Sequence, residues 1–122
     1  METTSTLATE VVRLTRSDGR VVCERCLVAT RPLRRMRGLL GRRSLPSGNG
    51  ILLKPAASVH TFFMRFPIDA VFLDREHRVV RIERDVRPWR ATGRRGSYAV
   101  LELPSGECEQ RELAIGDRLV SA

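Results

Sequence analysis

The alternation of apolar and polar residues along the chain predicts a domain built mainly from short β-strands. In residues 78–86, apolar side chains fall on one face and charged side chains on the other, as in a half-exposed strand. Valine-rich or apolar runs predict further strands at 10–16, 20–29, 51–53, 59–66, 68–74, 97–104 and 118–121. The Asp18-Gly19 pair between the first two runs favours a tight hairpin turn.

One helix is predicted early in the chain, directly after Thr30, which can cap it. Leu33, Met36 and Leu40 are spaced as one apolar stripe of an amphipathic helix. A second, much shorter helical turn is predicted within residues 107–113.

This set of elements predicts a mainly β (α+β) fold with one early α-helix. We expect a compact, curled or barrel-like, mostly antiparallel sheet in a single domain over residues 10–122, after a frayed N-terminus at 1–9. The apolar block 59–74, bent at Pro67, is expected to be the central part of the sheet, covered on both faces. Residues 87–96 are expected to form a mobile basic loop.

Length and charge restrict the function classes. At 122 residues the chain fits one domain. No segment has the features of a signal peptide, and no apolar run reaches the ~20 residues that span a bilayer, so we expect a soluble cytoplasmic protein with no membrane partner. The net charge of +8 comes almost entirely from arginine, with Lys54 as the single lysine. Such a basic, arginine-rich chain attracts polyanions, but a GC-rich genome gives the same bias.

Several motifs, taken in their order along the chain, resemble one known family. They are RGLLGR (37–42), GILL (50–53), HTFFMRFPIDAVFLD (60–74), VLELPSG (100–106) and IGD (115–117). Together they resemble the uncharacterised family "domain of unknown function 192", also called uncharacterised protein family 0127. The resemblance implies a small β-rich single domain with one early helix, and it implies no activity or mechanism.

Three ionisable residues lie within apolar runs and are the candidate catalytic residues: His60, Asp69 and Glu102. An ionisable group among apolar neighbours has a perturbed pKa and a burial cost that requires a partner. Each can be a satisfied structural group, with Asp69 accepting backbone N–H bonds at the Pro67 bend. Together with Met64 they can instead bind a ligand, or the two carboxylates can divide acid and base roles in catalysis.

Cys23 and Cys26 form a C-x-x-C motif, with Cys108 far away in the sequence. The motif lies in a predicted strand, where a spacing of three places the two side chains on opposite faces. We therefore expect reduced structural cysteines, with no metal site, no cofactor and no redox pair.

Arginines are concentrated in residues 31–43 and 87–95, and the candidate anion-binding residues are Arg34, Arg35, Arg42 and Arg94. Arginine side chains form two parallel hydrogen bonds with phosphates, and Trp89 can stack on a base. No nucleic-acid-binding motif accompanies them, and the usual interpretation of such segments is a solvated surface.

The sequence favours a binding or accessory module for a small polar ligand or a protein partner. Two alternatives remain open: a hydrolase-like enzyme that uses Asp69 and Glu102, and an arginine-mediated polyanion binder with weak, sequence-independent affinity for nucleic acid. Whether the chain is an enzyme is not decided by its sequence.

Overall fold

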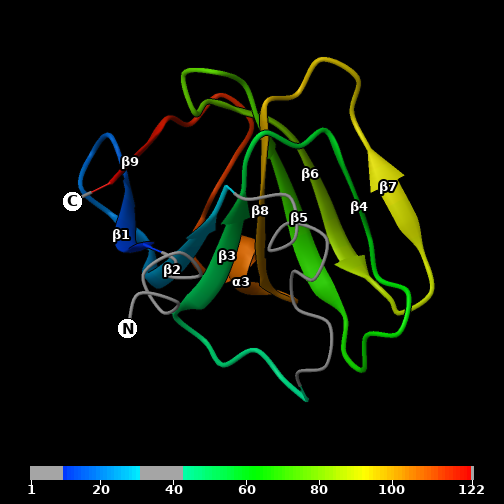
Figure 1. Ribbon diagram of the computed structural model, residues 1–122. Helices are drawn as coiled ribbons and strands as arrows, with labels where there is room; N and C mark the ends of the chain where they lie inside the picture. Colours follow the sequence, from blue (N-terminus) through cyan, green and yellow to red (C-terminus); the bar gives the residue numbers. More distant parts are fainter. Residues whose placement is uncertain (1–9, 31–42, 122) are drawn as a thin grey trace, which may run out of the picture.

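The computed structural model describes residues 10–30 and 43–121, and most of them belong to a curled seven-stranded sheet with a two-stranded ribbon beside it (Figure 1). The elements in chain order are β1 (Glu10–Arg16), β2 (Val21–Ala29), β3 (Asn49–Leu53), β4 (Ser58–His60), β5 (Ile68–Leu73), β6 (Val79–Val86), β7 (Ala91–Gly93), β8 (Ala99–Pro104), α3 (Glu107–Gln110) and β9 (Leu119–Ser121). The predicted mainly β fold is confirmed.

The strand order in the large sheet is β6-β5-β8-β3-β2-β1-β9. Strands β2 and β3 run parallel, and every other neighbouring pair in the sheet is antiparallel. An isolated bridge between Arg78 and Arg118 joins the start of β6 to the start of β9, and the Val79 N–H donates to the Asp117 carbonyl at 2.8 Å. The two edges of the sheet therefore meet at one end, which confirms the predicted curl.

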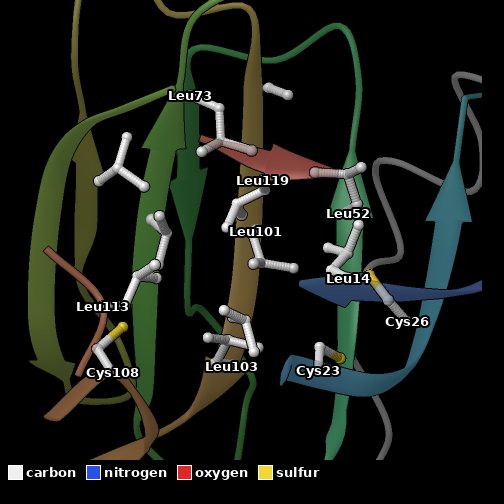
Figure 2. Packing of buried hydrophobic residues seen from close by; sticks show 14 of the residues in the cluster. Leu14, Cys23, Cys26, Leu52, Leu73, Leu101, Leu103, Cys108, Leu113 and Leu119 are labelled. Atoms are coloured by element: carbon white, nitrogen blue, oxygen red, sulfur yellow. The ribbon is translucent and has the colours of Figure 1, made fainter. Parts of the chain in front are cut away.

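The curl gives the sheet an inner and an outer face, each with its own apolar cluster. The inner cluster, shown in part in Figure 2, includes Leu14, Leu52, Val71, Leu73, Leu101, Leu103 and Leu119. The outer cluster includes Leu45, Ile51, Leu53, Val59, Met64, Ala70, Phe72 and Val100. Strand β5 is buried at all six positions because it contributes to both clusters.

The N-terminal half of the apolar block, 59–66, was predicted to be a strand of the main sheet, and this is wrong. Only Ser58–His60 is extended, and it pairs with β7, a strand inside the segment predicted to be a loop. A turn follows at Thr61, because its backbone and hydroxyl group bond to the segment 87–90 instead of to a neighbouring strand.

The predicted hairpin turn is present, with Gly19 in the left-handed region that only glycine adopts easily. The short helical turn predicted in 107–113 is also present, as α3. The early helix with Leu33, Met36 and Leu40, and the frayed segment 1–9, lie outside the described residues.

The two cysteines of the C-x-x-C motif lie on the same face of β2, which contradicts the prediction that they point apart. Val12 pairs with Cys26 and Leu14 pairs with Cys23, so β2 has one more residue than β1 over this stretch. This β-bulge exposes two consecutive residues between the cysteines and returns both thiols to the inner cluster (Figure 2). Hydrogen bonding with Cys23 and burial raise the pKa of the Cys26 thiol well above its usual range.

Candidate functional site

Asp69, on β5, is fully buried, and both of its carboxylate oxygens accept backbone hydrogen bonds. Oδ1 accepts the N–H of Asp85 at 2.9 Å, and Oδ2 accepts the N–H groups of Gly106 and Cys108, each at 3.1 Å. The expected backbone acceptor role is thus present, but the donors come from the end of β6 and the start of α3, not from the Pro67 bend. Asp69 connects three segments of the chain.

Glu102, on β8, is buried as deeply but has no comparable partners. Its side chain is 3% exposed, and its Oε1 atom accepts no hydrogen bond from any described residue. Its neighbours across the sheet are Ile51 and Ala70, which are both apolar. Burial raises the pKa of Glu102 to about 8, so the carboxyl group is largely protonated at neutral pH.

The two carboxylates lie on opposite faces of the sheet. Asp69 pairs with Leu103 of the inner cluster, whereas Glu102 pairs with Ala70 of the outer cluster. Side chains of successive residues in a strand point to opposite faces, so the sheet itself separates the two groups. The arrangement therefore does not form the acid–base pair on which the hydrolase-like alternative depends.

His60 lies apart from both carboxylates, on the exposed side of the β4–β7 ribbon, while its neighbour Val59 is buried in the outer cluster. The His60 Nδ1 atom accepts the N–H of Phe62 at 3.3 Å. Met64 is 5% exposed and belongs to the outer cluster. The four residues predicted to bind a ligand are therefore not gathered around one cavity.

A group of rings that was not predicted as a site gathers beside His60. Phe62, Phe63 and Trp89 are 39%, 69% and 54% exposed, respectively. The Trp89 ring stacks on Phe62 with 5.9 Å between centroids and meets Phe63 edge-on at 4.6 Å. The His60 ring lies 4.8 Å from that of Phe62. We call His60, Phe62, Phe63 and Trp89 the aromatic cluster.

Two of these aromatic residues have unfavourable backbone conformations. Phe63 and Trp89 both have φ of 67°, in the left-handed region that bulky side chains rarely adopt. A non-glycine residue held there costs on the order of 1–3 kcal/mol, and such strain is concentrated at functional sites. Surrounding contacts must therefore hold the two turns in place.

Thr61 supplies those contacts and is itself fully buried. Its hydroxyl donates to the Arg87 carbonyl at 2.6 Å and accepts the Arg90 N–H at 2.9 Å. Its backbone N–H donates to the Arg90 carbonyl at 2.8 Å, and its carbonyl accepts the N–H of Trp89 at 3.0 Å. One threonine thus joins the turn after β4 to the turn before β7 and brings together the backbone segments that carry the rings.

A cleft of about 380 Å³ lies between β6 and β7, and the turn that carries Trp89 contributes to its lining. Its lining residues are Arg81, Glu83, Asp85, Val86, Arg87, Arg90, Ala91 and Thr92. Arg81 forms an ion pair with Glu83, and the Nε atom of Arg87 lies 3.7 Å from the Oδ2 atom of Asp85. Because Arg87 and Arg90 flank Trp89 in the sequence, one short turn contributes cations to the cleft and a ring to the cluster.

Among the predicted anion-binding residues that the structure describes, Arg94 does not line this cleft. Arg94 is exposed beyond the end of β7, where its guanidinium donates to the Arg95 carbonyl at 3.2 Å. Arg34, Arg35 and Arg42 lie outside the described residues. The consecutive Phe62-Phe63 pair was the available signal for the aromatic cluster, because a half-buried strand would bury only one of the two rings.

The part of the chain that the structure describes contains neither a candidate metal site nor a candidate membrane-spanning helix. In residues 10–30 and 43–121, no group of three or more His, Cys, Asp or Glu side chains is placed to hold a metal ion. No helix in these same ranges is long and apolar enough to cross a membrane.

The fold and this site define a small curled β-sheet domain with an exposed aromatic and arginine-rich end. The chain belongs to the DUF192 family, described as "Uncharacterized ACR, COG1430", which matches residues 13–121. A UPF0127 protein of Thermococcus sibiricus is 32% identical over 114 residues, covering 87% of this chain and 71% of the relative. A UPF0127 protein of Pyrococcus furiosus is 39% identical over 64 residues, covering 52% and 54%.

Two solved structures share the fold. One is a Sinorhizobium meliloti protein whose name proposes a role as a transcription regulator; it has a TM-score of 0.81 and 26% identity, over 93% of this chain and 94% of that protein. The other is a Novosphingobium aromaticivorans protein of unknown function, with a TM-score of 0.79 and 23% identity, over 92% and 84%.

Asp69→Asn is expected to lower the melting temperature clearly. The amide retains one acceptor oxygen but turns a donor toward backbone N–H groups, and each buried group left unpaired costs about 1–3 kcal/mol. Thermal unfolding measures the loss, with the exposed Glu109→Gln as the control that should change stability by less than about 0.5 kcal/mol. Equal melting temperatures for Asp69→Asn and the wild type would contradict this role.

Glu102 is expected to make the protein less stable as the pH rises. Below the ordinary glutamate pKa, the Glu102 carboxyl group is protonated in both the folded and the unfolded state, so its ionisation does not affect the free energy of unfolding. Between that pKa and pH 8 only the unfolded state ionises, so the free energy of unfolding decreases as the pH rises. Glu102→Gln should match the wild type at acidic pH and exceed it at alkaline pH by a few kcal/mol. Melting curves across this pH range test this, with Glu10→Gln as the control; parallel curves for wild type and Glu102→Gln would refute it.

Proposed function

We propose that this chain is a binding module and that the aromatic cluster with the adjoining cleft is its ligand site. The proposed ligand is small and polar, with a flat ring and an anionic group. The observation that carries the proposal is the pair of strained turns, fixed by buried Thr61, that expose Phe63 and Trp89. Three buried free cysteines agree with the expected cytoplasmic location.

Stability alone does not account for this arrangement. Large aromatic side chains stabilise a domain when they are buried, and the strained backbone subtracts from the stability. An exposed cluster of rings on a rigid support is instead typical of an interaction site. The tight bonding of Thr61 gives the support, since it holds together the two turns that carry the rings.

The chemistry of the site determines the proposed ligand class. A flat ring can stack on Trp89 or Phe63, with each favourable ring pair adding about 0.5–1.5 kcal/mol beyond its buried area. The guanidinium groups of Arg87 and Arg90 match the geometry of a phosphate or carboxylate. A cleft of about 380 Å³ is large enough for a small molecule.

The Sinorhizobium meliloti neighbour has a name that proposes transcription regulation for that protein. A regulator requires a surface that contacts nucleic acid or a small effector. Rings beside arginines have suitable chemistry for either ligand.

Trp89 is the only tryptophan, so its fluorescence reports on this site alone. Titration with adenosine monophosphate is expected to quench it in a saturable way, more strongly than adenosine or ribose 5-phosphate, because each of these lacks one recognised group. Arg87→Ala should weaken the binding of adenosine monophosphate, whereas Arg13→Ala, which removes the same charge from exposed β1, should not.

Phe63→Gly separates binding from stability. Glycine adopts φ of 67° without strain, which offsets the lost ring contact and the added chain entropy, so the free energy of unfolding should stay within about 1 kcal/mol. Quenching by adenosine monophosphate should nevertheless weaken. Unaltered quenching in this variant, or no saturable quenching in the wild type, would overturn the proposed site.

A further inference from the structure

We infer that the ligand of the aromatic cluster is single-stranded nucleic acid, bound without sequence preference. Its bases would stack on Phe62, Phe63 and Trp89, and its phosphates would pair with Arg65, Arg87 and Arg90. This inference rests on the proposed function, because each nucleotide of a single strand supplies the flat ring and the anionic group of the proposed ligand class.

The first argument is the composition of the exposed surface. In the turns 61–66 and 87–90, every exposed side chain is aromatic or arginine: Phe62, Phe63, Arg65, Arg87, Trp89 and Arg90. Neither turn contains an acidic residue. Rings that accept unstacked bases, interleaved with cations that follow the backbone, are the two components of surfaces that bind single strands.

The second argument is charge. Arg65 and Arg90 form no ion pair with any described carboxylate, and Arg87 has only a distant one with Asp85, at 3.7 Å. These guanidinium groups are therefore available to an external anion. The net charge of +8 adds a long-range attraction for a polyanion, which a small ligand of low charge would use far less.

The third argument favours a single strand over a duplex. Base faces are reachable by stacking only where the bases are unpaired, and the rings here are presented by turns at the end of a short ribbon (Figure 1). A duplex would engage the arginines through its phosphates and leave the exposed rings without partners. Stacking is tolerant of base identity, so no sequence preference is expected.

Fluorescence anisotropy with a labelled oligothymidine of about 12 nucleotides, and with the same strand in a duplex, tests the inference at two salt concentrations. The single strand should bind at least tenfold more tightly than the duplex and should quench Trp89. Phe63→Gly should weaken single-strand binding roughly five- to 150-fold, the range for loss of one stacked base. Arg90→Ala should reduce the salt slope by about 0.7, which corresponds to one phosphate contact.

Two variants of β1 are the matched controls. Val11→Ala trims an exposed apolar side chain, 58% exposed, and Arg13→Ala removes an exposed cation, both on a strand far from β7 (Figure 1). Neither should change single-strand affinity by more than about twofold. Circular dichroism melts confirm that each variant is folded.

The outcomes distinguish the inference from the proposed function. If adenosine monophosphate quenches Trp89 but the oligonucleotide binds no more tightly than the mononucleotide, the proposed ligand site is supported and the inference of a single-stranded ligand is wrong. Equal affinity for single strand and duplex, with Phe63→Gly unaffected, would show attraction by charge alone and overturn the inference. If neither ligand quenches Trp89, both proposals fail, and a protein partner becomes the occupant to test.

Discussion

The carboxylate of Asp69 joins the end of β6 and the start of α3 to β5, in addition to the strand pairing that already links β5 with β6 and β8. It lies on β5 and accepts backbone N–H groups from Asp85, Gly106 and Cys108. These donors end β6 and begin α3, so one side chain sets how β6 ends and how the chain turns after β8. The same hydrogen bonds make Asp69 a poor candidate for a catalytic residue. Both carboxylate oxygens already accept backbone N–H groups, and the buried side chain is not accessible to a substrate.

Glu102, on the opposite face of the same sheet, is buried without the hydrogen bonds that compensate for the burial of Asp69. Its oxygen Oε1 has no donor among the described residues, and burial is the cause of its raised pKa. A neutral residue of the same shape would remove the desolvation penalty that appears when the group ionises. Glu102 is therefore a local weakness of the fold. The β-sheet lies between Glu102 and Asp69, because side chains at successive positions of a strand point to opposite faces of the sheet.

The sequence predicted the fold class and most strands, because alternation and valine-rich runs record which side of a strand is buried. It failed where tertiary contacts overrode the local pattern. A bulge in β2, opposite the stretch between Val12 and Leu14, placed Cys23 and Cys26 on one face, and alternation cannot show where a residue is inserted. The bonds of Thr61 to segment 87–90 converted an apolar run into an exposed turn. The candidate site depends on this long-range contact, so single residues such as Trp89 could be predicted but not their assembly.

The two ends of the apolar block 59–74 are similarly rich in apolar residues, but one end is buried and the other is partly exposed. In β5, every side chain is buried, and the one charge present is satisfied by backbone donors. In the turn after β4, by contrast, Phe62 and Phe63 face solvent on a backbone that is strained at Phe63. Proteins keep arrangements that reduce stability where function requires them. Because Thr61 is fully buried and bonded to the segment 87–90, its hydrogen bonds hold together the two turns that carry the rings. A preformed surface of this kind loses little conformational entropy on binding.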